Sequence, residues 1–112
     1  MTILLFRLFI VFQTLFLLSS NITLADEIDL EEGKSIFDSN CAACHSGGQN
    51  ILQAQKTLEK TVLEDNTMYS VTAITNQVKN GKNQMPAFKE RLSDDDINNV
   101  ANYVLYQANI GW

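Results

Sequence analysis

The chain has 112 residues, and its 13 acidic side chains outnumber its 8 basic ones, which gives a formal net charge of −5. This charge argues against nucleic acid as a partner, because the phosphate backbone would repel the chain. The length fits one small domain, which has little apolar core of its own.

The first element is an apolar run from Leu8 to Leu18, followed by polar residues and then by Thr23-Leu24-Ala25. This order is typical of a signal peptide with a small-x-small cleavage site. We predict a cleaved signal peptide over residues 1–25 and a mature domain over residues 26–112. The alternative is a permanent membrane anchor, but the run is short for a bilayer span. Cleavage would leave seven basic against thirteen acidic residues, a net charge of −6.

The mature domain is predicted to begin with a helix that is capped by Asp29 and runs to about Asn40. Glu32 follows the cap at the spacing of a capping box. Gly33 and Phe37 are four residues apart, so they share one face of this helix. The glycine would let another helix approach closely, and the phenylalanine would fill the space beside it.

The next five residues, Cys41-Ala42-Ala43-Cys44-His45, contain both cysteines and the only histidine of the chain. Cys-x-x-Cys-His is the attachment sequence of c-type haem. Two thiols on one helical turn can add to the two vinyl groups of a porphyrin, and the histidine can then bind the iron. We therefore predict one covalently bound haem c, which would also supply much of the apolar core that a small domain lacks.

Three other interpretations of this motif are weaker. A redox-active dithiol is expected after a strand in an α/β domain, and no strand pattern precedes Cys41. A structural zinc ion needs four ligands, and the chain offers two cysteines and one histidine with no second cluster. A disulfide between Cys41 and Cys44 would leave His45 without a role.

Two short helices are predicted next, over Thr57–Asp65 and Ser70–Asn80. Gly81 directly follows the second helix and is a typical stop signal. Gln77 lies at the margin of its apolar face, where the pattern alone favours a solvated side chain.

The last helix has the clearest periodicity, and Ser93 with Asp96 gives it a capping signal. Tyr103 flanks the apolar stripe and could widen the buried face toward the first helix, whereas Tyr106 lies on the opposite, surface side. No strand-like alternation appears in the mature chain, so the predicted fold class is all-α. The stripe consists of Ile97, Val100, Ala101, Val104, Leu105 and Ala108.

A haem iron bound by one histidine has a second axial position. Met85 stands in a non-helical segment that Pro86 would stiffen, so its sulfur could reach the iron, whereas Met68 precedes a helix start and suits core filling. Ligation by His45 and Met85 would leave no site for substrate and would raise the reduction potential, as in an electron carrier. An open position would instead indicate a haem enzyme or a gas sensor.

Beyond the haem motif, the chain from about residue 25 to residue 112 resembles the class I cytochromes c, and most closely the cytochrome c6 family. The haem motif alone is shared by many cytochromes, whereas the combination of segments is far more specific. The matching segments are Asn40–Gly48, Lys56–Leu58, Ala73–Thr75, Gln77–Asn83, Met85–Phe88, Arg91–Leu92, Ala101–Leu105 and Gly111–Trp112.

The resemblance implies a fold of about four helices around one haem, with the first and last helices crossing. It also implies thioethers at Cys41 and Cys44, axial ligation by His45 and Met85, and a Gln77 that approaches the haem and tunes its potential. Relatives often have a proline before Lys56 and an aromatic residue where this chain has Asn76, so the rigidity of one haem wall and the surface at the haem edge can differ here.

By this resemblance the chain is not an enzyme but a soluble, monomeric carrier of single electrons. It would move them from the cytochrome b6f complex to photosystem I in the thylakoid lumen of a plastid or cyanobacterium, and Arg91 would help it to dock. The alternative within the carrier class is a bacterial respiratory cytochrome in the periplasm that donates electrons to a terminal oxidase.

Overall fold

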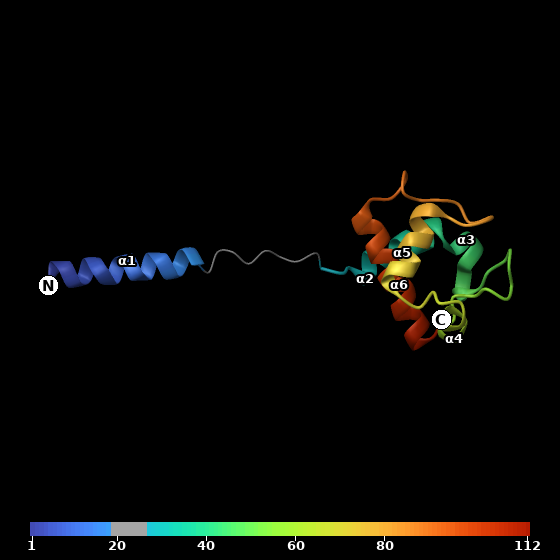
Figure 1. Ribbon diagram of the computed structural model, residues 1–112, viewed down its shortest axis with the longest axis horizontal. Coiled ribbons are helices and arrows are strands. Elements are labelled where there is room, and N and C mark those ends of the chain that lie inside the picture. Colours follow the sequence, from blue (N-terminus) through green and yellow to red (C-terminus); the bar gives the residue numbers. More distant parts are fainter. Residues whose placement is uncertain (19–26) are drawn as a thin grey trace.

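The computed structural model describes residues 1–18 and 27–112, with side chains for residues 1–14 and 27–112. In these ranges the chain is helical, and the only β pairing is an isolated bridge between Lys82 and Met85. The all-α prediction is thus confirmed (Figure 1). The elements are α1 (Thr2–Leu18), α2 (Leu30–Asn40), α3 (Ala42–His45), the 3₁₀ turn η1 (Ser46–Gly48), α4 (Lys60–Asp65), α5 (Val71–Asn80) and α6 (Asp94–Ile110).

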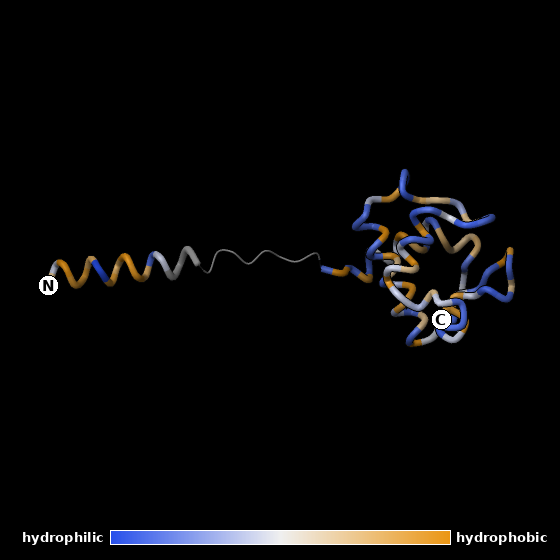
Figure 2. The backbone as a smooth tube through the Cα atoms, viewed as in Figure 1, coloured by the Kyte–Doolittle hydropathy of each residue, from blue (hydrophilic) through white to orange (hydrophobic). Residues whose placement is uncertain are grey.

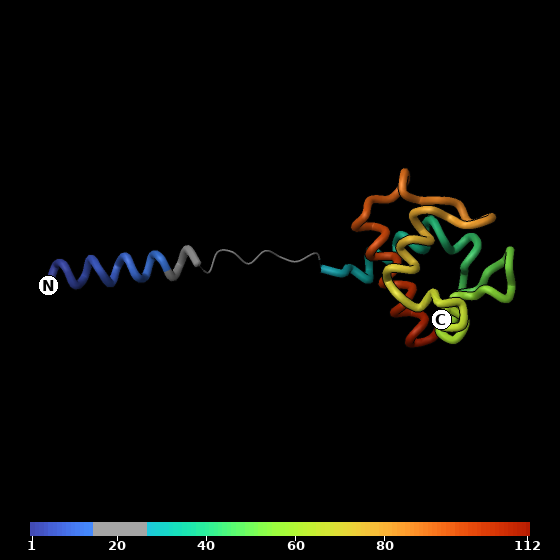
Figure 3. The backbone as a smooth tube through the Cα atoms, viewed as in Figure 1, coloured from blue at the N-terminus to red at the C-terminus, as the bar shows by residue number. Residues whose placement is uncertain are grey.

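Helices α2 and α6 lie side by side, although they stand at opposite ends of residues 27–112 (Figure 3). The Asp29 carboxylate accepts a hydrogen bond from the Glu32 amide at 3.0 Å, which confirms Asp29 as the cap of α2. In a capping box the Glu32 side chain would accept a hydrogen bond from the Asp29 amide. Here a residue from a distant part of the chain accepts this bond instead. The Asp29 amide donates to the side-chain oxygen of Asn99 in α6, also at 3.0 Å, so the start of α2 is fixed directly to α6.

The two helices cross at Gly33. A β-carbon at this position would overlap the backbone carbonyl of Asn99 and lie 2.9 Å from Cβ of Tyr103. Beside the crossing, the rings of Phe37 and Tyr103 pack with their centroids 5.4 Å apart. The predicted close approach at Gly33, with Phe37 and Tyr103 filling the adjacent space, is confirmed.

Gly33→Ala is expected to destabilise the fold by about 1–2 kcal/mol. Overpacking against a backbone carbonyl costs roughly 1–3 kcal/mol, and the better helix propensity of alanine offsets up to about 1 kcal/mol of this. Urea unfolding of the mature protein measures the change. Ser35→Ala, at an exposed position of the same helix, is the control and should change stability by less than about 0.5 kcal/mol. An equal stability of the two variants would contradict the crossing.

The core lies between α2, α5 and α6. The Ser93–Asp96 capping box is present at the start of α6, and Tyr106 on its outer face is 48% exposed, both as predicted. Every residue of the predicted stripe is buried except Leu105, which is partly buried. Two helix starts differ from the prediction, because α4 begins at Lys60 instead of Thr57 and α5 at Val71 instead of Ser70. The buried residues are Ile36, Phe37, Leu63, Ile74, Val78, Phe88, Ile97, Val100, Ala101, Tyr103, Val104 and Ala108.

Helix α4 starts three residues later than the sequence pattern predicts. The Leu58 amide donates to the carbonyl of Gly48 at 2.7 Å, and Glu59 then has an extended backbone with φ of −66° and ψ of 144°. This bond fixes the chain before α4 to the turn after the haem motif. The helix therefore forms only from Lys60 onward.

The apolar run near the amino terminus is helical as part of α1, and apolar colour dominates residues 2–14 of this helix in Figure 2. No helix within residues 1–18 and 27–112 has both the length and the apolar character needed to cross a membrane. The predicted cleavage site at Thr23-Leu24-Ala25 lies outside the described residues. The signal peptide therefore stays a prediction.

Candidate functional site

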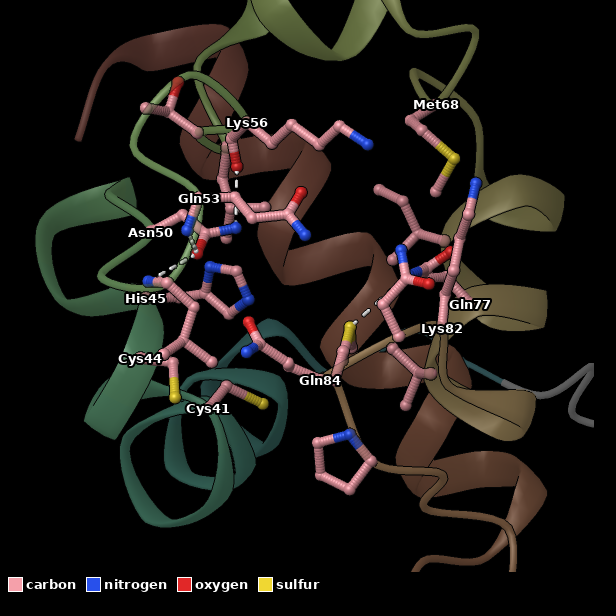
Figure 4. A pocket seen from close by; sticks show the side chains of 18 of the residues that line it. Cys41, Cys44, His45, Asn50, Gln53, Lys56, Met68, Gln77, Lys82 and Gln84 are labelled. Carbon is pink, nitrogen blue, oxygen red and sulfur yellow. Dashed lines mark hydrogen bonds between the residues drawn. The ribbon is translucent and has the colours of Figure 1, made fainter.

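A cavity of about 300 Å³ opens between α3, α5 and the loops that follow them. All five predicted site residues line it, namely Cys41, Cys44, His45, Gln77 and Met85. Figure 4 shows Cys41, Cys44 and His45 on one side of the cavity, with Met68, Gln77 and Lys82 on the other. The remaining lining residues are Asn40, Asn50, Leu52, Gln53, Lys56, Thr57, Leu58, Leu63, Asn66, Ile74, Val78, Asn83, Gln84, Pro86 and Phe88.

The haem motif forms a single helical turn that continues from α2. The Cys41 amide donates to the carbonyl of Phe37 at 2.9 Å and so ends α2. The amides of Cys44 and His45 both donate to the Cys41 carbonyl, at 3.1 and 2.9 Å, and close the turn of α3. Both thiols and the imidazole therefore reach the same cavity from five consecutive residues, as the spacing predicts.

The environment of the cysteines disfavours a redox-active dithiol. Burial, with a smaller contribution from Cys44, raises the pKa of the Cys41 thiol to about 11. Reactive dithiols need the opposite shift, because the thiolate is the nucleophile. A neutral, half-buried thiol at Cys41 is compatible with a thioether link, in which the sulfur carries no charge.

The orientation of His45 is fixed by the backbone. Its Nδ1 lies 2.9 Å from the carbonyl oxygen of Gln49. A carbonyl can only accept a hydrogen bond, so Nδ1 carries the proton and Nε2 keeps its lone pair. Metal-binding histidines generally have such a partner on the second ring nitrogen, which fixes the tautomer and makes the ligand more basic. Sequence reasoning did not find Gln49, because a backbone carbonyl leaves no side-chain signal.

Gln77 and Met85 contact one another in the cavity. The Gln77 amide lies 3.6 Å from Sδ of Met85 and donates a hydrogen bond to it, drawn as a dashed line in Figure 4. The pattern of the helix alone favoured a solvated Gln77, but the side chain is half-buried beside the sulfur. The hydrogen bond distinguishes Met85 from Met68, which also lines the cavity.

The segment that carries Met85 is held close to the end of α5. Backbone hydrogen bonds of 3.0 Å join Lys82 and Met85 in both directions, and the amide of Phe88 donates to the Val78 carbonyl at 2.9 Å. Gly81 ends α5 with φ of 66° and ψ of 175°, and its α-carbon packs directly against the backbone around Pro86. This turn brings Met85 back over the cavity.

The side chain of Asn50 forms three hydrogen bonds within the loop on the opposite side of the cavity. Its side-chain oxygen accepts hydrogen bonds from the amides of Leu52 and Gln53, at 3.1 and 2.9 Å. Its amide group donates to the Lys56 carbonyl at 3.0 Å. Asparagine is a common turn residue, but nothing in the sequence pattern singles out this one. These three bonds restrain the backbone between Asn50 and Lys56.

The residues around the cavity fit a covalently bound haem. One wall offers two thiols on a single turn and an imidazole with a free Nε2, and another wall offers a thioether. Apolar side chains such as Leu58, Ile74 and Phe88 complete the lining, as a porphyrin face requires.

Comparisons with known proteins agree with this chemistry. Residues 28–104 match the family model "Cytochrome C oxidase, cbb3-type, subunit III". A cytochrome c6 of Gracilaria tenuistipitata var. liui is 50% identical over 109 residues, which cover 97% of this chain and 98% of the relative. A cytochrome c6 of Bumilleriopsis filiformis is 61% identical over 84 residues, which cover 75% of this chain and 98% of the relative.

Solved structures give the same result for the fold. The structure of cytochrome c6 from the diatom Phaeodactylum tricornutum superposes with a TM-score of 0.73 at 51% identity, covering 75% of this chain and 99% of that one. The chain belongs to the cytochrome c6 family. It is a c-type cytochrome that carries electrons, and it has one covalently bound haem c.

Proposed function

We propose that this chain carries single electrons through a haem whose two axial positions are filled by His45 and Met85. The observation that carries the proposal is that an imidazole with a free Nε2 and a hydrogen-bonded thioether line the same cavity. Cys41 and Cys44 would hold the group covalently on the side of His45. When bound, the haem supplies an iron that changes between Fe(II) and Fe(III) by one electron.

The protein groups around the iron would tune and protect it. The Gln49 carbonyl keeps His45 in one tautomer, and the Gln77 amide orients the Met85 sulfur. A hydrogen bond to the sulfur withdraws electron density from it, which favours Fe(II) and raises the reduction potential. With both axial positions filled, no position remains for a substrate, so we propose that the chain is not an enzyme.

The proposed route runs from the cytochrome b6f complex to photosystem I in the thylakoid lumen. The cytochrome c6 relatives support it, because this chain spans 98% of each of the two described above. The 84 residues shared with the Bumilleriopsis protein are close in number to the 87 that cleavage after residue 25 would leave. This similarity also supports a mature domain of residues 26–112. A respiratory route to a terminal oxidase finds less support, since the Gracilaria and Bumilleriopsis relatives are both cytochromes c6 and are matched over 98% of their length.

Arg91 is suited to docking beside the haem site. Its guanidinium carbon lies 4.5 Å from the ring centroid of Phe88, and Phe88 is 5% exposed and lines the cavity. Arg91 itself is exposed, so its charge stands at the surface next to the wall of the site. On an otherwise acidic protein this charge would meet an acidic patch of photosystem I.

Arg91→Glu is expected to slow the reduction of photosystem I, on the order of tenfold at low salt, because it places like charges at the contact. The defect should shrink as salt screens the charges. The absorption spectrum and the reduction potential should change little. Flash-induced kinetics of photosystem I with the parent and the variant at several salt concentrations measure the effect.

Lys60→Glu is the matched control, because it changes the net charge equally. Lys60 also stacks on an aromatic ring, 5.3 Å from the centroid of Tyr69, but it does not line the haem cavity. Its effect should be small at every salt concentration. If both variants slow the reaction equally, net charge and not Arg91 governs docking. If the parent does not reduce photosystem I at all, the proposed route is wrong.

A further inference from the structure

Trp112, the last residue of the sequence, forms a hydrogen bond with a residue 54 positions earlier in the chain. Its indole nitrogen donates a hydrogen bond of 2.8 Å to the carbonyl of Leu58. The ring packs against Phe37 and Tyr103, with centroid distances of 5.3 and 6.2 Å. These contacts anchor Trp112 between α2, α6 and the chain that leads into α4.

The same ring packs against Gly48. Gly48 directly precedes the loop over residues 49–57, and Leu58 directly follows it. A β-carbon on Gly48 would overlap the indole, and Gly48 has a φ of 75°, so glycine is needed here for two reasons. The Leu58 amide in turn donates to the Gly48 carbonyl at 2.7 Å. Trp112 therefore contacts both ends of this loop, where they are already joined to each other.

This loop connects Trp112 to the haem side of the molecule. Its first residue, Gln49, follows Gly48 directly and provides the carbonyl that accepts from Nδ1 of His45. Ile51 adds a second link, since its amide donates to the Cys44 carbonyl at 3.1 Å. Asn50, Leu52, Gln53, Lys56 and Thr57 of the loop line the haem cavity.

We propose that Trp112 is a positioning residue for His45. It holds Gly48 and Leu58 together, and this keeps the Gln49 carbonyl on Nδ1 of the imidazole. Without the indole, the loop opens more often and the hydrogen bond of His45 opens with it. The inference rests on the proposed function in that it takes His45 to be an axial ligand.

The test compares the matured haem protein with its Trp112→Ala and Trp112→Phe variants in the Fe(II) state. Hydrogen exchange of the His45 Nδ1 proton, followed by NMR, reports opening of its bond to Gln49. The backbone amide of Val78, within α5, reports the general stability of the fold. Tryptic cleavage after the exposed Lys56 reports opening of the loop itself.

In Trp112→Ala the His45 proton is expected to exchange about tenfold faster, while the Val78 amide changes much less. Trp112→Phe keeps a ring but loses the donor to Leu58, so a smaller increase of roughly two- to fivefold is expected. Cleavage after Lys56 should accelerate in the same order. Tyr106→Ala removes an exposed aromatic ring from α6, the helix that precedes Trp112, and should change none of these rates.

Equal acceleration at His45 and Val78 would show that Trp112 stabilises the whole fold without positioning His45, and so would overturn the inference. Unchanged exchange at His45 in a folded variant would overturn it as well. Where Trp112→Ala does not fold, the Trp112→Phe variant decides by the same criteria. Failure of the proposed function looks different, because the His45 resonance of the parent would then lack the ring-current shift of an axial ligand.

Discussion

Met85→Ala is expected to abolish the weak far-red absorption band that accompanies thioether–Fe(III) ligation. The variant should bind cyanide in the Fe(III) state and carbon monoxide in the Fe(II) state, because an axial position becomes accessible. Its reduction potential should fall on the order of 0.1 V, since the thioether favours Fe(II) and axial ligands control potentials over a span of roughly 0.8 V. Absorption spectra and a redox titration of the matured protein measure all three changes.

Met68→Ala provides the matched control, because Met68 carries the only other thioether that lines the cavity among the described residues. It should keep the far-red band and its resistance to cyanide, and lose only packing. A truncation of a partly buried methionine costs at most about 2–3 kcal/mol of stability. Loss of the band in Met68→Ala, with the band retained in Met85→Ala, would falsify the assignment of Met85.

Gly81→Ala is expected to destabilise the protein by about 3 kcal/mol. With φ of 66° and ψ of 175°, Gly81 occupies a region that essentially only glycine adopts. An added β-carbon would also lie 2.5 Å from the Met85 carbonyl oxygen and 2.8 Å from the Ala87 amide nitrogen. Both costs act on the turn that places Met85, so the far-red band should weaken too. Thermal unfolding and the absorption spectrum measure the two effects.

Gly111→Ala separates the cost of backbone strain from the cost of overlap between the added β-carbon and its neighbours. Gly111 also has a positive φ, 101°, with ψ of 139°, but nothing lies within 4 Å of its added β-carbon. This variant should lose only on the order of 1 kcal/mol and keep the far-red band unchanged. If Gly81→Ala costs no more than Gly111→Ala, the contact with the Met85 segment does not matter.

The sequence predicted those parts of the structure that depend on neighbouring residues. Asp29, Ser93 and Asp96 cap their helices within one turn, and Gly81 ends a helix by its own conformation. The haem motif places its three functional groups on one turn for the same reason. Such short-range signals are visible without a structure.

The parts that the sequence did not reveal depend on residues that are distant in the chain. The Glu32 side of the α2 capping box was predicted from spacing, but Asn99, 67 positions later, takes that role. The Gln49 carbonyl that orients His45 and the Trp112 ring on Gly48 carry no periodic signal either. The sequence pattern also did not single out Asn50, whose side chain bridges the loop before Lys56. These features became visible only once the fold brought the segments together.

The central claim is that this protein fills both axial positions of its haem and uses the iron only to carry electrons. An optical redox titration of the matured protein, repeated under carbon monoxide, tests it most directly. We predict a reversible one-electron transition, a far-red band in the Fe(III) state, and an Fe(II) spectrum that carbon monoxide does not change. A parent protein that binds carbon monoxide readily, with a shifted Fe(II) spectrum, would contradict the claim and indicate an open site for a substrate or a gas.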